Sequence, residues 1–252
     1  MLLDYLKLLL FRRVQKGFKT RKTRLENFTV FYNYPRSLFS EFKNIFKNKS
    51  YHFESENPAP FIIDGGGHFG LSVLYFKKVY PKAKILVFEP DREILKLLKQ
   101  NIAANKLTGV TVVESGLHSR DGMLAFNSDQ TDGGKLSESG NELIKVEKLS
   151  GHINTEVDFL KLNIEGAELE VLKELDESGK INYIREMCLE WHSFPNQKQN
   201  LGQLLSILEK NKFRYLINHY DYKINKFIKP PFKIKNKMYY LLVYAKRENL
   251  FN

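Results

Sequence analysis

The sequence contains very little cysteine and no long hydrophobic run. Its 252 residues include one cysteine, Cys188, so no disulfide can form within the chain, as is typical of proteins in a reducing cytoplasm. No apolar stretch approaches the ~18 residues of a membrane-spanning helix. The first segment is interrupted by Asp4 and Lys7 and does not have the pattern of a secretory signal. We therefore predict a cytoplasmic protein.

Acidic residues are scarce relative to basic ones, and the excess of positive charge lies at the two ends. The formal net charge is +11. Residues 1–24 contain eight Lys or Arg and one acid, residues 209–252 contain eleven and three, and the residues between them are mildly acidic. The basic ends are either solvated surface or binding surfaces for phosphate-bearing lipids or an anionic substrate. The middle of the chain has no interleaved basic and aromatic strand face, so we expect no nucleic-acid partner.

Residues 1–58 are predicted to form an N-terminal basic helical extension. Residues 1–24 place four apolar side chains at helical spacing: Leu3, Leu6, Leu10 and Val14. Three roles stay open for this helix. It lies on the inner face of a membrane as a peripheral contact, packs on the rest of the chain, or packs on a second subunit in a homodimer. The proline-rich residues 57–60 separate the extension from the main domain, residues 59–252.

Beyond the extension, short apolar runs alternate with amphipathic segments, which predicts an α/β fold with a doubly wound, mostly parallel sheet. The last two runs have no helix between them and predict an antiparallel hairpin at the edge of the sheet. The predicted strands are 59–64, 84–88, 110–114, 157–163, 183–190, 213–219 and 238–245, and the predicted helices are 70–79, 91–105, 167–177 and 198–211. Residues 115–150 are predicted to be irregular, and their glycine-rich residues 132–135 are either a substrate lid or a mobile connector.

The most informative pattern is a glycine loop after the first predicted strand. Asp64 ends that strand, Glu89 follows the second strand, and the loop contains Gly65, Gly66, Gly67, His68 and Gly70. Such a loop holds a nucleotide-type cofactor at the carboxyl ends of the strands. Asp64 would repel the pyrophosphate of a dinucleotide, whereas it would attract the ammonium and sulfonium groups of S-adenosylmethionine. The pattern therefore favours S-adenosylmethionine, with Glu89 accepting hydrogen bonds from the ribose. In the structural alternative, Asp64 only caps the loop and Glu89 is a surface acid.

Two further polar clusters lie at the ends of later strands. Lys161, Asn163 and Glu165 alternate along one face of the fourth predicted strand, where burying polar groups without a ligand is costly. The structural alternative is an ion pair between Lys161 and Glu165. His192 follows the fifth strand and is a candidate general base, because histidine titrates near neutral pH. A lone histidine is also a common structural group.

In these three clusters the sequence resembles the FkbM-type methyltransferases, a branch of the class I S-adenosylmethionine-dependent enzymes. The resemblance extends over residues 41–245 and rests on four motifs in order: DGGGHFG at 64–70, FEP at 88–90, LKLNIEGAE at 160–168 and EWHSF at 190–194. The sequence differs from the family pattern at His68, where the family usually has Asn, and at Asn163, where it usually has Asp.

The resemblance implies a Rossmann-like fold with a seven-stranded sheet and O-methylation of a hydroxyl group on a sugar, a glycan or glycolipid, or another small natural product. For this reaction His192 and Glu165 are the candidate bases, and Lys161 is the candidate stabiliser of charge. Ser115 and Gly116 are expected beside the adenine and Asn163 beside the methionyl group, and no metal site is assigned. The alternative is a catalytically silent S-adenosylmethionine-binding or scaffold protein, suggested by the two departures. A nucleic-acid methyltransferase and a dehydrogenase are further rivals.

Overall fold

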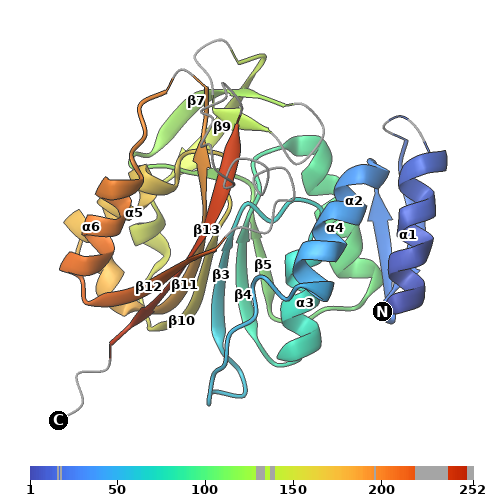
Figure 1. Ribbon diagram of the computed structural model, residues 1–252, viewed down its shortest axis with the longest axis horizontal. Helices are drawn as coiled ribbons and strands as arrows, with labels where there is room; N and C mark the ends of the chain where they lie inside the picture. Colours follow the sequence, from blue (N-terminus) through green and yellow to red (C-terminus); the bar gives the residue numbers. More distant parts are fainter. Residues whose placement is uncertain are drawn as a thin grey trace, which may run out of the picture.

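A sheet of seven strands lies between two layers of helices (Figure 1). The computed structural model describes residues 1–15, 17, 19–128, 134–136, 140–195, 197–218 and 238–248. The strands of this sheet are β3 (Phe61–Gly65), β4 (Lys84–Phe88), β5 (Val110–Val113), β10 (Val157–Leu162), β11 (Ile184–Ser193), β12 (Phe213–Asn218) and β13 (Tyr239–Arg247). Their order across the sheet is β12-β13-β11-β10-β3-β4-β5.

The strands from β5 to β11 run parallel, so their connections place helices on both faces of the sheet. All six residues of β10 are buried, as expected for a strand covered on both sides. Within this sheet β13 is antiparallel to both of its neighbours, β11 and β12. The predicted doubly wound sheet and its C-terminal antiparallel hairpin are therefore confirmed. In this hairpin β13 lies between β11 and β12, and β12 forms the edge of the sheet.

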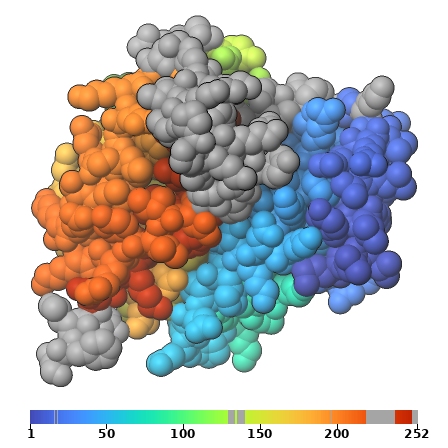
Figure 2. All heavy atoms as spheres, viewed as in Figure 1, coloured from blue at the N-terminus to red at the C-terminus, as the bar shows by residue number. Residues whose placement is uncertain are grey.

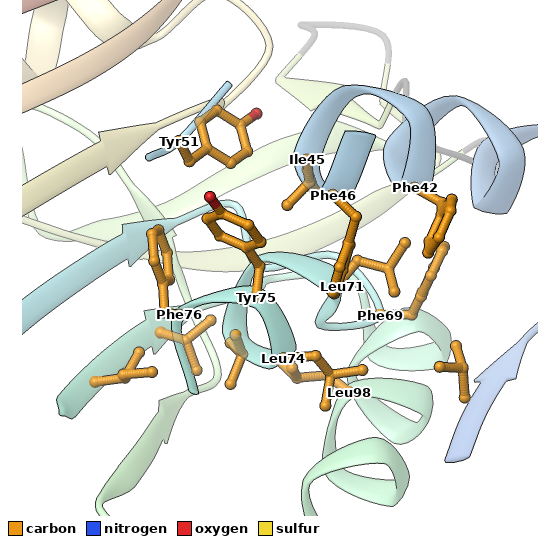
Figure 3. Packing of buried hydrophobic residues seen from close by; sticks show 14 of the residues in the cluster. Phe42, Ile45, Phe46, Tyr51, Phe69, Leu71, Leu74, Tyr75, Phe76 and Leu98 are labelled. Carbon is orange, nitrogen blue, oxygen red and sulfur yellow. The ribbon is translucent and has the colours of Figure 1, made fainter. Parts of the chain in front are cut away.

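One helical layer covers the sheet with a cluster of aromatic side chains. Its elements are α3 (Leu71–Val79), α4 (Arg92–Ala104), α2 (Pro35–Glu41) and a π-helical segment over Phe42–Lys47. Figure 3 shows Phe42 and Phe46 of the π-helical segment pointing toward Phe69 and Leu71. The rings of Phe42 and Phe46 stack with centroids 5.2 Å apart. This packing fixes the segment directly above the glycine loop.

The second helical layer lies on the opposite face of the sheet (Figure 1). It consists of α5 (Glu168–Glu177) and α6 (Leu201–Lys210), with short 3-10 segments at Leu149–His152 and Lys180–Tyr183. Its core is mostly aliphatic, and Leu172 and Leu175 of α5 are fully buried in it. The two layers together hold the carboxyl ends of the parallel strands in place.

The N-terminal extension is partly helical and partly a hairpin. Helix α1 (Leu2–Val14) was predicted, but the predicted helix over 1–24 is wrong at its end, where β1 (Arg21–Leu25) pairs antiparallel with β2 (Phe28–Tyr32). The pattern RKTRL hides this strand because only Thr23 and Leu25 face inward. The side-chain amide of Asn101 on α4 bonds both the N–H and the C=O of Phe31, so the extension packs on the main domain.

The predicted irregular stretch 115–150 contains a second sheet, so that prediction is wrong. The strands are β6 (Gly116–Leu117), β7 (Gly122–Asn127), β8 (Lys135–Leu136) and β9 (Glu142–Glu147), in the order β6-β9-β7-β8. The sequence signal is weak because the strands are short and their core is small: among the described residues it contains the buried Phe126, Ile144 and Val146. Residues 132 and 133 of the predicted lid lie outside the described residues.

Candidate functional site

A cleft of about 280 Å³ opens at the carboxyl ends of the parallel strands. It lies where the strand order reverses between β3 and β10, which is where doubly wound sheets bind their ligands. Five parts of the chain line it: the N-terminal extension, the loop after β3, the end of β4 with the second sheet, the ends of β10 and β11, and the start of β13. The cleft therefore joins segments that are far apart in the sequence.

The glycine loop uses its backbone amides within the protein. The N–H groups of Gly66 and Gly67 both donate to the carbonyl oxygen of Phe88, at 3.0 and 2.9 Å. The N–H of His68 donates to Oε2 of Glu89 at 2.8 Å. A loop that binds a pyrophosphate presents such amides to the phosphate oxygens instead. Because these three amides are occupied, the loop suits a cofactor without phosphate groups.

Gly66 also brings the loop into close contact with the end of β10. A Cβ atom on Gly66 would lie 1.9 Å from the carbonyl oxygen of Asn163, and its φ of +82° is unfavourable for other residues. The N–H of Asn163 donates to the carbonyl oxygen of Gly65 at 3.0 Å. Gly65 and Gly70 lie behind the cleft lining. These two predicted cofactor residues therefore shape the backbone of the site.

Asp64 and Lys161 form a buried ion pair between β3 and β10. They are register partners in the two strands, and Nζ of Lys161 lies 2.8 Å from Oδ1 of Asp64, with 3% and 0% of their side chains exposed. Lys161 also donates to carbonyl oxygens of the glycine loop. The structure thus pairs Lys161 with Asp64 instead of Glu165. The negative charge of Asp64 is compensated within the protein, and Asp64 does not line the cleft.

Three polar groups in the cleft fit the predicted S-adenosylmethionine. The buried carboxylate of Glu89, whose pKa is raised by burial, accepts hydrogen bonds from the backbone amides of His68 and Asp91 and has lone pairs left for a ribose diol. Among the described residues, Oγ of Ser115 and Oδ1 of Asn163 are buried without a hydrogen-bond partner. Both residues line the cleft. Such atoms are expected where a ligand completes the hydrogen bonding.

His68 links the glycine loop to the N-terminal extension. Its φ of +47° belongs to the left-handed region, in which both histidine and the family's usual asparagine are enriched. Its Nδ1 is hydrogen-bonded to Oε1 of Glu41 at the end of α2. Glu41 and its neighbour Ser40 line the cleft. His68, which differs from the family's usual asparagine, therefore connects the glycine loop to the side of the cleft that the extension forms.

His192 lies within a group of carboxylates at the end of β11. Its Nδ1 is 3.2 Å from Oε1 of Glu168, and its Nε2 is 3.3 Å from Oε1 of Glu165 and 3.9 Å from Oε1 of Glu190. Burial lowers the pKa of His192, but the hydrogen bonds to Glu165 and Glu168 outweigh burial and hold the pKa well above its ordinary value. Both ring nitrogens therefore face carboxylates, an arrangement that favours the protonated imidazole.

Glu190 is the buried carboxylate of this group that titrates near neutral pH. Burial, reinforced by the charge of Glu165, raises the pKa of Glu190 to about 7, although His192 opposes the shift. Its Oε2 accepts hydrogen bonds from the hydroxyl of Tyr51 and from Nδ2 of Asn163, each at 3.2 Å. The side chain faces the same cleft. Glu190 can therefore exchange a proton with a group bound there.

Most of the predicted site residues meet in this cleft. The catalytic candidates Lys161, Glu165 and His192 line it together with Gly66, Gly67, His68, Glu89, Ser115, Gly116 and Asn163, whereas Asp64, Gly65 and Gly70 lie behind it. Sequence reasoning did not single out Glu190, Tyr51 or Glu41. Glu190 could have been found from its alternation with His192 on one strand; the two residues of the extension left no local signal. Among the described residues, no group of three or more His, Cys, Asp or Glu could hold a metal ion.

A family model for the methyltransferase FkbM domain matches residues 64–215. This range begins at the end of β3 and ends within β12, so it contains the glycine loop and the ends of β10 and β11. It does not include the extension. The matched part covers more than half of the chain.

Two curated relatives are methyltransferases. Methyltransferase 1 of Beauveria bassiana (strain ARSEF 2860) is 27% identical over 231 residues, which cover 78% of this chain and 90% of the relative. Methyltransferase sdnD of Sordaria araneosa is 32% identical over 176 residues, which cover 54% of this chain and 68% of the relative.

Solved methyltransferase structures share the fold. Methyltransferase FkbM from Methylobacillus flagellatus KT superposes with a TM-score of 0.53 at 17% identity, covering 77% of this chain and 45% of that one. This chain thus spans less than half of that protein. TYW2 from M. jannaschii, solved in complex with AdoMet, has a TM-score of 0.50 at 14% identity and covers 93% of this chain and 89% of its own.

Proposed function

This chain belongs to the FkbM family of methyltransferases, and from this premise we propose that it methylates a hydroxyl oxygen of a sugar, a glycan or glycolipid, or another small natural product. The family predicted from the four motifs is confirmed, as are methyltransferase function and the cofactor S-adenosylmethionine. The oxygen acceptor and its class are the proposal. The observation that supports it most strongly is the set of carboxylates around His192.

Methyl transfer to oxygen requires two things of the protein: it must align the acceptor oxygen with the methyl group, and it must remove the hydroxyl proton. When bound, S-adenosylmethionine supplies an electrophilic methyl group, whose bond to sulfur breaks as the new oxygen–carbon bond forms and whose electron pair stays on sulfur. A neutral hydroxyl needs a base for its proton as charge develops on the oxygen. The cleft must also hold that oxygen in line with the methyl group. Carboxylates at the end of β11 can meet both needs.

Glu190 is the base in this proposal, in place of His192. Glu165 and Glu168 hold the pKa of His192 above its ordinary value against the effect of burial, which favours the protonated imidazole and makes it a poor base. The pKa of Glu190, about 7 through burial, matches the value that an efficient base needs at neutral pH. The acceptor's proton passes to the Glu190 carboxylate and from there to solvent.

His192 and Asn163 position that base. The imidazolium lies 3.9 Å from Oε1 of Glu190 and favours its ionised form. Nδ2 of Asn163 donates to Oε2 of Glu190, while Oδ1 of Asn163 is buried without a hydrogen-bond partner among the described residues. Glu190 is thereby held between the predicted methionyl end of the cofactor and the acceptor side. The polar side chains around Glu190 favour the binding of a hydroxylated acceptor over that of an apolar one.

The experiment is a turnover assay with methyl-labelled S-adenosylmethionine and a panel of sugars, glycolipids and hydroxylated natural products. Mass spectrometry and fragmentation of the product locate the methyl group. We expect an oxygen-methylated product and an acidic limb near pH 7 in the dependence of kcat/KM on pH. A methyl group found on nitrogen or carbon would overturn the choice of oxygen.

The matched variants are Glu190→Gln and Glu186→Gln, which remove carboxylates from the same strand. Glu186 lies outside the cleft lining and pairs with Lys246. We expect E190Q to lower kcat by about 10²- to 10⁴-fold while calorimetry shows unchanged S-adenosylmethionine affinity. E186Q should keep full activity. Equal losses in both variants would remove Glu190 from the mechanism.

The catalytically silent alternative predicts a different outcome of the same assay. In that case S-adenosylmethionine and its demethylated product bind, but no acceptor in the panel is methylated. The buried Oδ1 of Asn163, which has no partner among the described residues, and the left-handed conformation of His68 are compatible with cofactor binding in either case. Turnover, and not binding, separates the two.

A further inference from the structure

Helix α1 has two apolar faces, and only one of them is used in the fold. Leu8 is fully buried, and Tyr5, Leu9 and Phe11 are partly buried against the aromatic cluster. Arg12 lies over the ring of Phe39. These contacts pack the helix on α2 and on the aromatic cluster. The opposite face of α1 is therefore exposed to solvent, although the helix itself is packed on the protein.

The outer face of α1 is a row of exposed leucines. Leu3 is 81% exposed, and the other four members are between 51% and 70% exposed: Leu2, Leu6, Leu10 and Val14. At about 100° per residue these five side chains share an arc of about 120°. Figure 2 shows the dark blue atoms of the first residues at the outer edge of the molecule. Half of the large apolar side chains that are exposed in the described residues belong to residues 1–14.

The surroundings of this row are strongly basic. Residues 1–24 contain eight Lys or Arg and a single acid, Asp4, which lies 3.3 Å from the amino group of Met1. Arg13 falls inside the apolar arc. Lys7 lies at its border and reaches the carbonyl oxygen of Arg24 on β1. Within the described part of the chain, none of Lys7, Arg13 and Arg24 forms an ion pair with a carboxylate.

We propose that the outer face of α1 docks on an anionic phospholipid surface. Leucines with basic residues at the border are the composition of helices that lie in the headgroup region, with the apolar side chains inserted about 5–10 Å deep. The surrounding Lys and Arg then meet the negative surface potential of the lipids. No described helix is long and apolar enough to cross a bilayer.

Charge distinguishes this occupant from a second copy of the chain. Two copies joined through this face would bring two basic segments together, including Arg13 of each. The nearby acid Glu26 is already paired with Lys78 and with the amino group of Met1. A lipid surface supplies the negative charge that the protein lacks here. The inference does not depend on which acceptor is methylated.

The test is co-sedimentation of the full chain with lipid vesicles at low salt. We expect binding to vesicles of equimolar phosphatidylcholine and phosphatidylglycerol, and binding weaker by about tenfold or more to phosphatidylcholine alone. The variant Leu3→Gln/Leu6→Gln/Leu10→Gln removes the apolar row, keeps the charge and uses a residue with good helix propensity. It should lose at least about tenfold in binding to the mixed vesicles.

The control variant is Leu143→Gln/Leu216→Gln, which changes two leucines that are 64% and 66% exposed elsewhere. It should bind like the wild type, and thermal melts should show that both variants are folded. Undiminished binding of the triple variant would overturn the proposal and assign vesicle binding to charge alone, including that of residues 209–252. A wild-type dimer in light scattering that the triple variant converts to a monomer, without vesicle binding, would assign the face to a second copy.

Discussion

Nδ2 of Asn163 donates a hydrogen bond to Oε2 of Glu190, at 3.2 Å, across the boundary between β10 and β11. In the family pattern that the sequence resembles, position 163 is usually an aspartate. A carboxylate at this position would face Glu190 and repel its ionised form. The amide instead stabilises that form. Asn163 and Glu190 are thus a compatible pair, and the departure at position 163 is consistent with an active base at position 190.

Asn163→Asp should therefore shift the pH dependence of turnover. A second negative charge beside Glu190 favours its protonated form and moves its pKa above about 7. We expect the acidic limb of kcat/KM to move to higher pH by about one unit or more, with activity at pH 7 reduced about tenfold and largely recovered under alkaline conditions. Steady-state kinetics across pH measure this shift.

The control for that shift is the double variant Asn163→Asp/Glu190→Gln. It has no carboxylate at position 190, so any remaining pH dependence comes from other groups. We expect its residual activity to show no acidic limb near neutral pH. A limb that stays in place in Asn163→Asp would mean that Glu190 does not set it.

The sequence predicts those parts of the site whose residues belong to a recognisable local sequence pattern. The glycine loop, Glu89 and the row ending at Glu165 lie at strand ends, and strand ends follow from the alternation of apolar runs. The pairing of Lys161 with Asp64 depends on two strands becoming neighbours in register across about 100 residues of chain. Tyr51 reaches Glu190 from the extension. Such contacts have no local signal, and neither does the small core of the second sheet.

Glu190→Gln should make the protein more stable than the wild type as the pH rises. The pKa of Glu190 is raised to about 7 by burial, whereas an unfolded glutamate has a pKa of about 4.3. The folded state keeps this proton longer, so the stabilisation is complete below pH ~4.3 and is lost as the pH rises to about 7. The glutamine side chain of the variant cannot ionise, so its advantage should grow across this window by a few kcal/mol, at about 1.4 kcal/mol per unit of pKa difference.

Urea denaturation of the wild type and Glu190→Gln at several pH values measures that advantage. His192 also has a raised pKa, so it stabilises the fold below pH ~6.5 and loses this effect at higher pH. It is present in both proteins, so the difference between them reports mainly on Glu190. A constant difference from pH 4 to pH 8 would contradict a raised pKa for Glu190.

Gly66→Ala should disrupt the loop, because the new methyl group would lie 1.9 Å from the carbonyl oxygen of Asn163 and the φ of +82° disfavours alanine. We expect a loss of more than about 3 kcal/mol in the free energy of unfolding, with S-adenosylmethionine affinity reduced in calorimetry. Gly151→Ala is the matched control, since a Cβ there has no atom within 4 Å. Equal stability of the two variants would show that the loop does not need to approach β10 so closely.

The variant Lys161→Met tests which of two roles this lysine has. It is either the counter-ion of Asp64 or a group that stabilises charge on the acceptor. Removing the ammonium leaves Asp64 buried and uncompensated, so we expect a loss of about 3–5 kcal/mol in the free energy of unfolding. The double variant Lys161→Met/Asp64→Asn removes both charges and should recover most of that loss.

If Lys161 is a counter-ion, turnover returns together with stability in the double variant, because the loop is restored and no acceptor contact has been removed. If the double variant is stable, binds S-adenosylmethionine and remains inactive, Lys161 acts on the acceptor as the sequence predicted. The buried position of Nζ, bonded to Asp64 and to the glycine loop, favours the first outcome.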